Sequence, residues 1–300
     1  MAKIGDGGAP LGEIFVERPA KGKPHSGKVL AAVQAHADDI PFFCAGTIAK
    51  LIDEGYTAYL IQTTNDEKCG PTRSIGETIL SNEKDIEELA KVLGFKGIFN
   101  LGYRNHLMDG ESPLEIRCRL IFLFRLLKVD TVFTFNPWGH FEENPDHWVT
   151  GAAVEAAAWM AGMDKDYPEH LAAGLKPHSV RERYYWVARE GQPYNRVVDI
   201  APWIEKKVEA ICVNKTQGPG GYAGRRLKAR LAAKGLRLPA LDGSDEDADR
   251  AYVRLFLLEP FEKLGRLYGL DYAEAFYYIG PKDWSSEVED YIAKNALPLK

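Results

Sequence analysis

The sequence predicts an α/β protein with a Rossmann-like, mostly parallel sheet that carries helices on both faces, plus a C-terminal mainly helical extension. Strand and helix patterns alternate from about residue 28 to about residue 160, which is typical of such sheets. The first strand is an almost continuous apolar run, as expected of a strand buried on both faces. We therefore expect an N-terminal extension (residues 1–26), a Rossmann-like core (27–200) and a mainly helical part packed on that core (201–300).

The individual elements follow from short apolar runs and from apolar residues at helical spacing. Strands are expected at residues 28–35, 56–64, 97–101, 130–135, 183–189 and 196–200. Helices are expected at residues 42–54, 81–93, 113–127, 145–160 and 202–213. Residues 217–249 combine a Gly-rich run with basic and then acidic residues. We interpret this segment as an excursion between helices, either a solvated loop or a lid or oligomer contact.

The composition argues against several classes of protein. The 38 Lys and Arg against 43 Asp and Glu give a net charge of −5, which disfavours nucleic acid as a partner. The four cysteines are scattered, as in a reduced cytosolic protein. No apolar run reaches the about 18–20 residues of a membrane span, and the first residues do not resemble a secretory signal. We expect a cytoplasmic protein with a small-molecule substrate and no membrane span, with a homo-oligomer as one option.

Two polar clusters each follow a predicted strand. The first contains His36, Asp38 and Asp39, and the second runs from Asn136 into the helix that includes His147. Ligands of open α/β sheets bind beyond the carboxyl ends of the strands, so we expect the two clusters to meet. A His and an Asp from one strand end, with a His from the other, would make a 2-His-1-carboxylate site for a divalent cation such as zinc.

Asp38 and Asp39 are adjacent, so their side chains diverge at the turn from strand to helix. One can therefore bind the ion while the other takes a proton from a water that the ion activates. Structural explanations exist as well. A His after a strand is often only hydrogen-bonded, and Asp39 or Asp146 could simply cap a helix. The residue types alone leave the metal site and these structural roles open.

These motifs resemble those of the LmbE/PIG-L-like N-deacetylase family, which includes the deacetylases of N-acetylglucosaminyl-phosphatidylinositol, of mycothiol and bacillithiol precursors, and of chitobiose. His36-Ala-Asp-Asp39 is similar to the family's first motif, AHPDDE, and Asn144-Pro-Asp-His147 to its second, HPDH. The similarity extends over about residues 28–217. It implies a Rossmann-like fold and a zinc ion bound by His36, Asp39 and His147. It also implies Asp38 as general base in the hydrolysis of an N-acyl group, usually the acetyl of an amino sugar.

The sequence departs from the family pattern at several positions. Ala37 and Ile40 replace the Pro and Glu of the first motif, and Asn82 stands where many relatives carry an Arg. Asn144 replaces the first His of the second motif. An Asn can donate a hydrogen bond to an oxyanion but cannot deliver a proton at neutral pH.

The missing His leaves the acid of the reaction open. In the family, that His is expected to work with the residue at Asp146. His140, four residues before Asn144, is a candidate replacement, and a loop histidine with no role is the alternative. We therefore name Asp38, His140, Asn144 and Asp146 as candidate catalytic residues.

Other polar side chains follow the remaining strands and could hold the substrate. The candidates are Asn65, Glu67, Arg104, Asp109 and Trp138, the last by stacking on a sugar face. Solvated loop positions, or simple packing for Trp138, are the alternatives.

The leading functional hypothesis is metal-dependent hydrolysis of an N-acyl amide on an amino sugar or small glycoside. The loss of the usual His motivates a second, a metal-dependent lyase or another hydrolysis on a carbohydrate. A third is a non-enzymatic sugar- or nucleotide-binding module, which is disfavoured because no GxGxxG turn follows the first strand and no GxxxxGK[ST] motif occurs.

Overall fold

The computed structural model describes residues 9–139, 141–281 and 284–299. Within them, eight strands form one sheet in the order β1-β7-β8-β6-β5-β2-β3-β4. Neighbouring strands are parallel except at β8, which is antiparallel to both β6 and β7. The strands are β1 Ala9–Glu17, β2 Val29–Gln34, β3 Thr57–Thr64, β4 Gly97–Tyr103, β5 Thr131–Phe135, β6 Glu182–Trp186, β7 Pro193–Asp199 and β8 Ala273–Ile279. The predicted α/β class with a mostly parallel sheet is confirmed.

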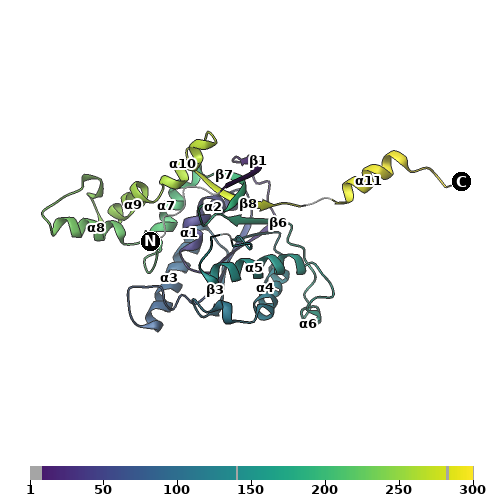
Figure 1. Ribbon diagram of the computed structural model, residues 1–300, viewed down its shortest axis with the longest axis horizontal. Helices are drawn as coiled ribbons and strands as arrows, with labels where there is room; N and C mark the ends of the chain where they lie inside the picture. Colours follow the sequence, from purple (N-terminus) through teal and green to yellow (C-terminus); the bar gives the residue numbers. More distant parts are fainter. Residues whose placement is uncertain (1–8, 140, 282–283, 300) are drawn as a thin grey trace.

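Helices cover both faces of this sheet (Figure 1). They are α1 Asp39–Phe43, α2 Ala45–Asp53, α3 Ile75–Leu93, α4 Pro113–Leu127, α5 Pro145–Met160, α6 Pro168–Ala172, α7 Ile204–Val213, α8 Ala223–Ala232, α9 Asp245–Phe256, α10 Glu259–Leu267 and α11 Trp284–Asn295. Short 3-10 helices occupy Met108–Gly110, Ala201–Trp203 and Pro239–Leu241.

The two hydrophobic cores follow from the alternation of side chains along the strands. In β2, Leu30 and Ala32 belong to the core that contains residues of α2, α3 and α7. Ala31 and Val33 belong to the core that contains residues of α4 and α5. Successive residues of a strand point to opposite faces, so β2 must be apolar throughout to contact both helical layers. The near-continuous apolar run of the first strand therefore has the expected cause.

Two strands lie in segments for which the sequence patterns predicted none. β1 falls within the expected N-terminal extension and pairs with β7 at the edge of the sheet. β8 falls within the mainly helical C-terminal part and lies between β6 and β7. Glu274 interrupts the apolar pattern of β8, although it is only 1% exposed. That interruption hides an interior strand from an analysis of hydrophobic periodicity.

Glu274 is part of a buried ion pair that fixes the segment after the first polar cluster. Its Oε1 lies 2.7 Å from Lys207 Nζ on α7, and both side chains are fully buried. Lys207 also donates to the carbonyls of Pro41 and Phe42 in α1, while Glu274 accepts from the first N–H groups of α2. Removing one partner of such a pair typically costs about 3–5 kcal/mol. The C-terminal part thus holds α1 and α2 in place against the sheet.

The rest of the C-terminal part is arranged in two ways. α7, α9 and α10 form a third apolar cluster with Phe42 of α1. α11, in contrast, extends away from the sheet in Figure 1, and residues 288–299 are exposed. In the described part of the chain, no helix is both long and apolar enough to cross a lipid bilayer.

Candidate metal site and active-site cavity

The first polar cluster forms a tight turn where β2 ends. Asp39 Oδ2 accepts hydrogen bonds from the N–H of Ala35 (2.9 Å) and of His36 (2.7 Å). These bonds fold the chain back so that the imidazole of His36 and the carboxylate of Asp39 share one side of the turn. Because Oδ2 is occupied, Oδ1 is the oxygen left to face other groups. It lies 3.6 Å from His147 Nε2.

His147 is brought to this turn by α5, which begins where the second cluster ends. Its ring stacks on Phe135, the last residue of β5, with centroids 4.0 Å apart. Gly151, one turn further along α5, permits this approach because an added Cβ would lie 2.8 Å from Phe135 O. The helix can therefore pack directly on the end of the strand, and His147 meets His36 from the neighbouring strand end.

His36, Asp39 and His147 converge closely enough to hold one ion. His36 Nδ1 and His147 Nε2 are 2.9 Å apart, and with a carboxylate oxygen of Asp39 the potential ligand atoms lie within 4.8 Å of one another. All three side chains are buried. The structure thus brings the predicted ligand set together from the ends of β2 and β5, as the strand-end argument expected.

Two further carboxylates turn the imidazoles toward that point. Asp146 Oδ2 lies 3.0 Å from His36 Nε2, and Glu142 Oε1 lies 3.0 Å from His147 Nδ1. Asp146 holds the proton of His36 Nε2, so Nδ1 of this ring faces the common point, while Glu142 lies at ion-pair distance from His147 Nδ1, which has no aligned hydrogen-bond partner among the described residues. Carboxylates commonly orient metal-binding histidines in this way. The donor set and its supports therefore fit a divalent ion such as zinc.

Asp146 is fully committed to this supporting role. Besides His36, it accepts from Asn105 Nδ2 and from the N–H of His106 and Met108. Burial alone would raise its pKa, but the hydrogen bonds from His36 and these N–H groups outweigh that effect and lower it. Asp146 therefore lies behind His36 as an anchored anion.

Carboxylates outnumber cationic groups in the cluster, and this imbalance shifts the pKa values of its side chains. Burial lowers the pKa of His36, but the bond to Asp146 and the nearby carboxylates outweigh burial and raise it to about 10. Desolvation, reinforced by repulsion from Asp39, raises the pKa of Asp38 to about 6. Excess negative charge thus draws a proton onto His36, and a bound divalent ion would displace that proton.

Asp38 differs from Asp39 in having a free carboxylate. It occupies the N-cap position of α1 but makes no side-chain cap hydrogen bond, and within the described residues only its own backbone N–H bonds to its carboxylate. Asp39, in contrast, has one oxygen tied to two N–H groups. The two adjacent carboxylates therefore diverge, one anchored toward the ligand set and one open to the cavity.

Asn144 combines a structural and a cavity-facing group. As N-cap of α5, its Oδ1 accepts from the N–H of Asp146 at 3.0 Å. Because Oδ1 accepts this bond, the remaining side-chain atom must be Nδ2, which is a hydrogen-bond donor. Nδ2 has no hydrogen-bond acceptor among the described residues. Asn144 also lines the cavity that contains the ligand set. It therefore offers a hydrogen-bond donor near the converging histidines.

The cavity above the ligand set has a volume of about 520 Å³. Asp38 and His106 lie in its wall together with side chains that the sequence analysis did not name as site residues, among them Phe42, Phe43 and Arg189. Arg189 donates to Glu142 at 2.8 Å and so completes a chain from Arg189 through Glu142 to His147. Arg189 follows β6 by three residues, so the strand-end rule could have found it. The only sequence feature that could have indicated Glu142 as a site residue is its position next to the second motif.

Comparison with known proteins identifies relatives of this chain. The sequence profile of the PIG-L family, described as GlcNAc-PI de-N-acetylase, matches residues 31–158. The diacetylchitobiose deacetylase of Thermococcus kodakarensis is 30% identical over 198 residues, which are 64% of this chain and 71% of that protein.

The chain belongs to the PIG-L family.

Two other family relatives support the same assignment. A probable N-acetyl-alpha-D-glucosaminyl L-malate deacetylase 2 of Bacillus anthracis is 24% identical over 187 residues, covering 61% of this chain and 78% of that protein. The solved structure of the N,N'-diacetylchitobiose deacetylase from Pyrococcus horikoshii is similar with a TM-score of 0.67 and 25% identity, over 84% of each chain. Its deacetylase relatives identify this member of the PIG-L family as an amidohydrolase. Its Rossmann-like core is the one that the family resemblance implied.

The side chains predicted to bind substrate do not line the cavity of this PIG-L family member. Glu67 forms an ion pair with Arg104 and accepts a hydrogen bond from Asn65. Trp138 is half exposed and packs edge-on against Tyr185 and Tyr277. Asp109 is exposed in the 3-10 helix Met108–Gly110. Their assignment as substrate contacts remains a prediction, as does any role for His140, which lies outside the described residues.

Asn82, at the position where many relatives carry an Arg, has a structural task here. Its Nδ2 donates to the carbonyls of Cys69 and Thr78, and its Oδ1 accepts from Gln217. Gln217 also lines the cavity. Asn82 thus ties α3 to the Gly-rich segment and leaves no free group for a substrate.

A second group of potential ligands, Cys118, Glu169 and His170, does not suit a cation. Arg125 Nη1 lies 3.4 Å from His170 Nδ1, so that nitrogen accepts and Nε2 carries the proton toward Cys118. The nitrogen nearest the thiol is therefore blocked as a ligand. The buried, permanently charged guanidinium would also repel a cation.

Proposed function

We propose that this chain removes the N-acetyl group of an amino sugar with the help of a divalent ion, zinc in the first instance. The ion would be held by His36 Nδ1, Asp39 Oδ1 and His147 Nε2. The observation that carries the proposal is the convergence of these three atoms, with the other polar atom of His36 bound by Asp146, that of Asp39 bound by backbone N–H groups, and Glu142 3.0 Å from Nδ1 of His147. A bound ion would supply a Lewis acid that polarises the acyl carbonyl and activates water.

Asp38 is the group proposed to move protons. Its carboxylate is free, and its pKa of about 6 suits an acid–base group at neutral pH. It takes a proton as the water oxygen bonds to the acyl carbon. It then returns that proton to the nitrogen as the C–N bond breaks, giving acetate and a free amine. This double role answers the absence of the usual His, because Asn144 cannot deliver a proton.

Asn144 is proposed to stabilise the oxyanion that develops on the acyl oxygen. Its Oδ1 is fixed by the N–H of Asp146, so its Nδ2 is held in one orientation within the cavity wall. A donor fixed in advance stabilises developing charge without having to reorganise during the reaction. Asn144 can thus donate the hydrogen bond that the family's His would donate, but it cannot deliver a proton.

The direct test is release of acetate by the zinc-loaded protein from N-acetylglucosamine and N,N'-diacetylchitobiose. We expect acetate and free amine in equal amounts. No acetate from a wide panel of N-acetyl sugars would reject the proposal and favour a metal-dependent lyase on the same fold. A His140→Gln variant completes the test: if Asp38 returns the proton, it retains turnover, whereas its inactivity would assign the acid to His140.

A further inference from the structure

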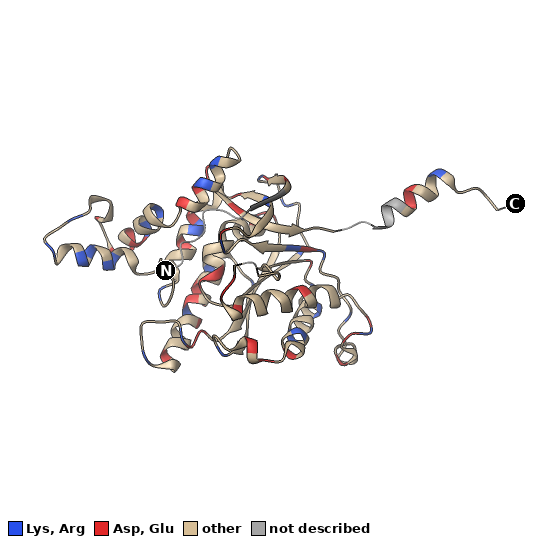
Figure 2. Cartoon of the chain, viewed as in Figure 1, with Lys and Arg blue, Asp and Glu red and all other residues tan. Residues whose placement is uncertain are grey.

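The excursion after α7 carries a helix with an unusual distribution of charge. The chain leaves the core at α7, forms the Gly-rich segment 217–221 and enters α8, which packs against α9. Figure 2 shows a cluster of basic residues on α8. From the sequence, this segment could be a solvated loop, a lid or an oligomer contact. The structure shows that its basic residues differ in whether they have an acidic partner.

Some cations of α8 are neutralised by the acidic start of α9. Arg225 donates to Asp249 and Glu246, and Lys228 lies 3.5 Å from Asp245. Arg226 and Arg230, in contrast, have no carboxylate within 4 Å in the described residues. They are four residues apart, so they share one face of the helix, where like charges disfavour each other. An uncompensated pair of guanidinium groups on one face is the arrangement that a bound anion would stabilise.

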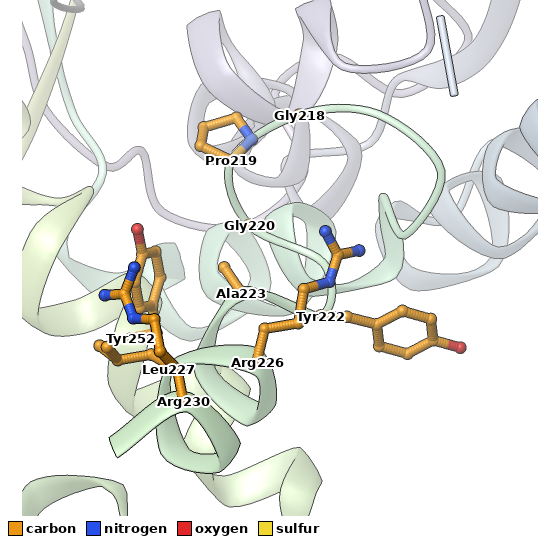
Figure 3. A pocket seen from close by; sticks show the side chains of 9 residues that line it. All are labelled: Gly218, Pro219, Gly220, Tyr222, Ala223, Arg226, Leu227, Arg230 and Tyr252. Carbon is orange, nitrogen blue, oxygen red and sulfur yellow. The ribbon is translucent and has the colours of Figure 1, made fainter. Parts of the chain in front are cut away.

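These two arginines line a cavity of about 280 Å³, the α8 pocket, formed with Gly218, Pro219, Gly220 and Tyr252 among others. In Figure 3 the side chains of Arg226 and Arg230 extend from α8 on opposite sides of Ala223, Arg226 toward Gly218 and Arg230 toward Tyr252. The Tyr252 hydroxyl makes no hydrogen bond within the described residues. The pocket therefore presents two planar cations and a hydroxyl donor, the groups that recognise phosphate or carboxylate.

The α8 pocket and the catalytic cavity share a wall. Gly218 and Pro219 line both. On the catalytic side, a Cβ added to Gly218 would lie 3.4 Å from the Cβ of Asp38. A ligand that leaves the catalytic cavity over this wall would therefore meet Arg226 and Arg230 next.

The shared wall is rigid. A Cβ on Gly220 would lie 2.3 Å from Ile211 Cγ2, so this segment packs directly on α7. The preceding residues are tied down as well, because Asp85 Oδ2 accepts from the N–H of Lys215 (2.7 Å) and of Thr216 (2.6 Å). The distance between the two cavities is therefore set by the fold, as a site with two fixed subsites requires.

We propose that the α8 pocket is a binding subsite for an anionic group, a phosphate or a carboxylate, on the part of the substrate that lies beyond the reacting amino sugar. The identity of the reacting group rests on the proposed function, whereas the anion site does not. The preferred substrates would then be N-acetyl sugars linked to an acidic group, with neutral sugars such as N,N'-diacetylchitobiose cleaved less efficiently.

The test compares matched ligands on matched variants. N-acetylglucosaminyl-glucuronate and N-acetylglucosaminyl-glucose differ only by a carboxylate in place of a hydroxymethyl group. N-acetylglucosamine 1-phosphate and methyl N-acetylglucosaminide form the phosphate pair. The variants are Arg226→Gln/Arg230→Gln and a control, Lys234→Gln/Arg237→Gln. The control removes the same charge from exposed residues of the same excursion that do not line the α8 pocket.

Dissociation constants are measured by calorimetry in the Asp38→Asn background, and kcat/KM with the base intact. We expect the wild type to prefer at least one acidic ligand over its neutral counterpart, and Arg226→Gln/Arg230→Gln to reduce that preference at least tenfold. The control is expected to keep the wild-type preference. The acidic pair that shows the larger preference identifies carboxylate or phosphate. No preference in the wild type, or equal losses in both double variants, would overturn the proposal.

The two proposals fail separately. Calorimetric preference for an acidic ligand without acetate release from any sugar would reject the deacetylase reaction and uphold the anion site. Acetate release with no preference between acidic and neutral ligands would reject the anion site alone. Arg226→Lys/Arg230→Lys, which keeps the charge but loses the two-pronged guanidinium geometry, is expected to show an intermediate preference.

Discussion

The catalytic cavity and the α8 pocket are adjacent but are lined by groups of opposite charge. In the cavity, carboxylates and imidazoles lie buried at the ends of β2 and β5, each imidazole with a further carboxylate 3.0 Å from its outer nitrogen. In the α8 pocket, two exposed guanidinium groups rise from a helix outside the sheet. The first suits a cation and the second an anion. The contrast separates groups that would cleave the amide from groups that would select the substrate, so each set should be changeable without the other.

The largest expected effect comes from removing a ligand. His147→Ala should lose both the bound metal and acetate release, because two remaining ligands cannot hold the ion tightly. Metal content by mass spectrometry and turnover with added zinc would be measured together. His178→Gln, a change at a histidine that does not line the cavity, should alter neither. A His147→Ala protein that kept stoichiometric metal would exclude His147 from the ligand set.

Removing the proposed base should uncouple metal binding from turnover. Asp38→Asn preserves shape but cannot take a proton, so kcat should fall by about 10²–10⁴-fold while the metal content stays that of the wild type. Steady-state acetate release and metal analysis on the same preparation would measure this. A fully active variant would contradict the role of Asp38, and a metal-free one would place Asp38 among the ligands.

A smaller effect is expected from the support behind His147. Glu142→Gln removes the charge that lies 3.0 Å from His147 Nδ1, and should weaken zinc binding by about 10–100-fold. Its neighbour provides a matched control, because Glu143 also pairs with Arg189 but its side chain is 68% exposed. Competition with a chelator of known affinity would measure both variants. Equal effects of Glu142→Gln and Glu143→Gln would assign the loss to general charge rather than to orientation of His147.

The most gradual predicted effect is the pH dependence of metal binding. The pKa of His36 is raised to about 10 in the metal-free protein, so this ring is protonated between pH 6 and 8. Binding must displace that proton, so zinc affinity should rise with pH, by up to about tenfold per unit. Chelator competition at pH 6, 7 and 8, corrected for protonation of the chelator, would show the slope. An affinity that is flat or falls with pH would contradict the protonated His36.

The candidate metal site could be predicted from the sequence because its side chains lie on short local turns at the ends of strands. His36 and Asp39 are three residues apart on one turn, and His147 lies in the first turn of a helix whose bounds, Pro145–Met160, the apolar pattern also predicted. Parallel strands bring such turns to one edge of the sheet. Spacing and strand order therefore suffice to place these side chains near one another.

The rim of the cavity could not be predicted in the same way. Arg104 and Glu67 have suitable chemistry, but their side chains turn to each other, and Trp138 packs on tyrosines of β6 and β8. Side-chain direction in a loop depends on tertiary neighbours that residue types do not reveal. α8 was hidden for a related reason, since the Gly-rich residues before it suggested a loop although Ala, Leu and Arg in α8 favour a helix.

The antiparallel insertion of β8 has a consequence for how the protein is made. Strands β2 to β6 emerge from the ribosome in order and can pair at once, but β7 and β1 join them only through β8, which is synthesised after the other strands of the sheet. Until then β6 and β7 each present an unpaired edge, the kind of surface that recruits other strands. Translation that stops before Ala273 would leave both edges open, so we expect shortened products to aggregate rather than to persist as partly active enzyme.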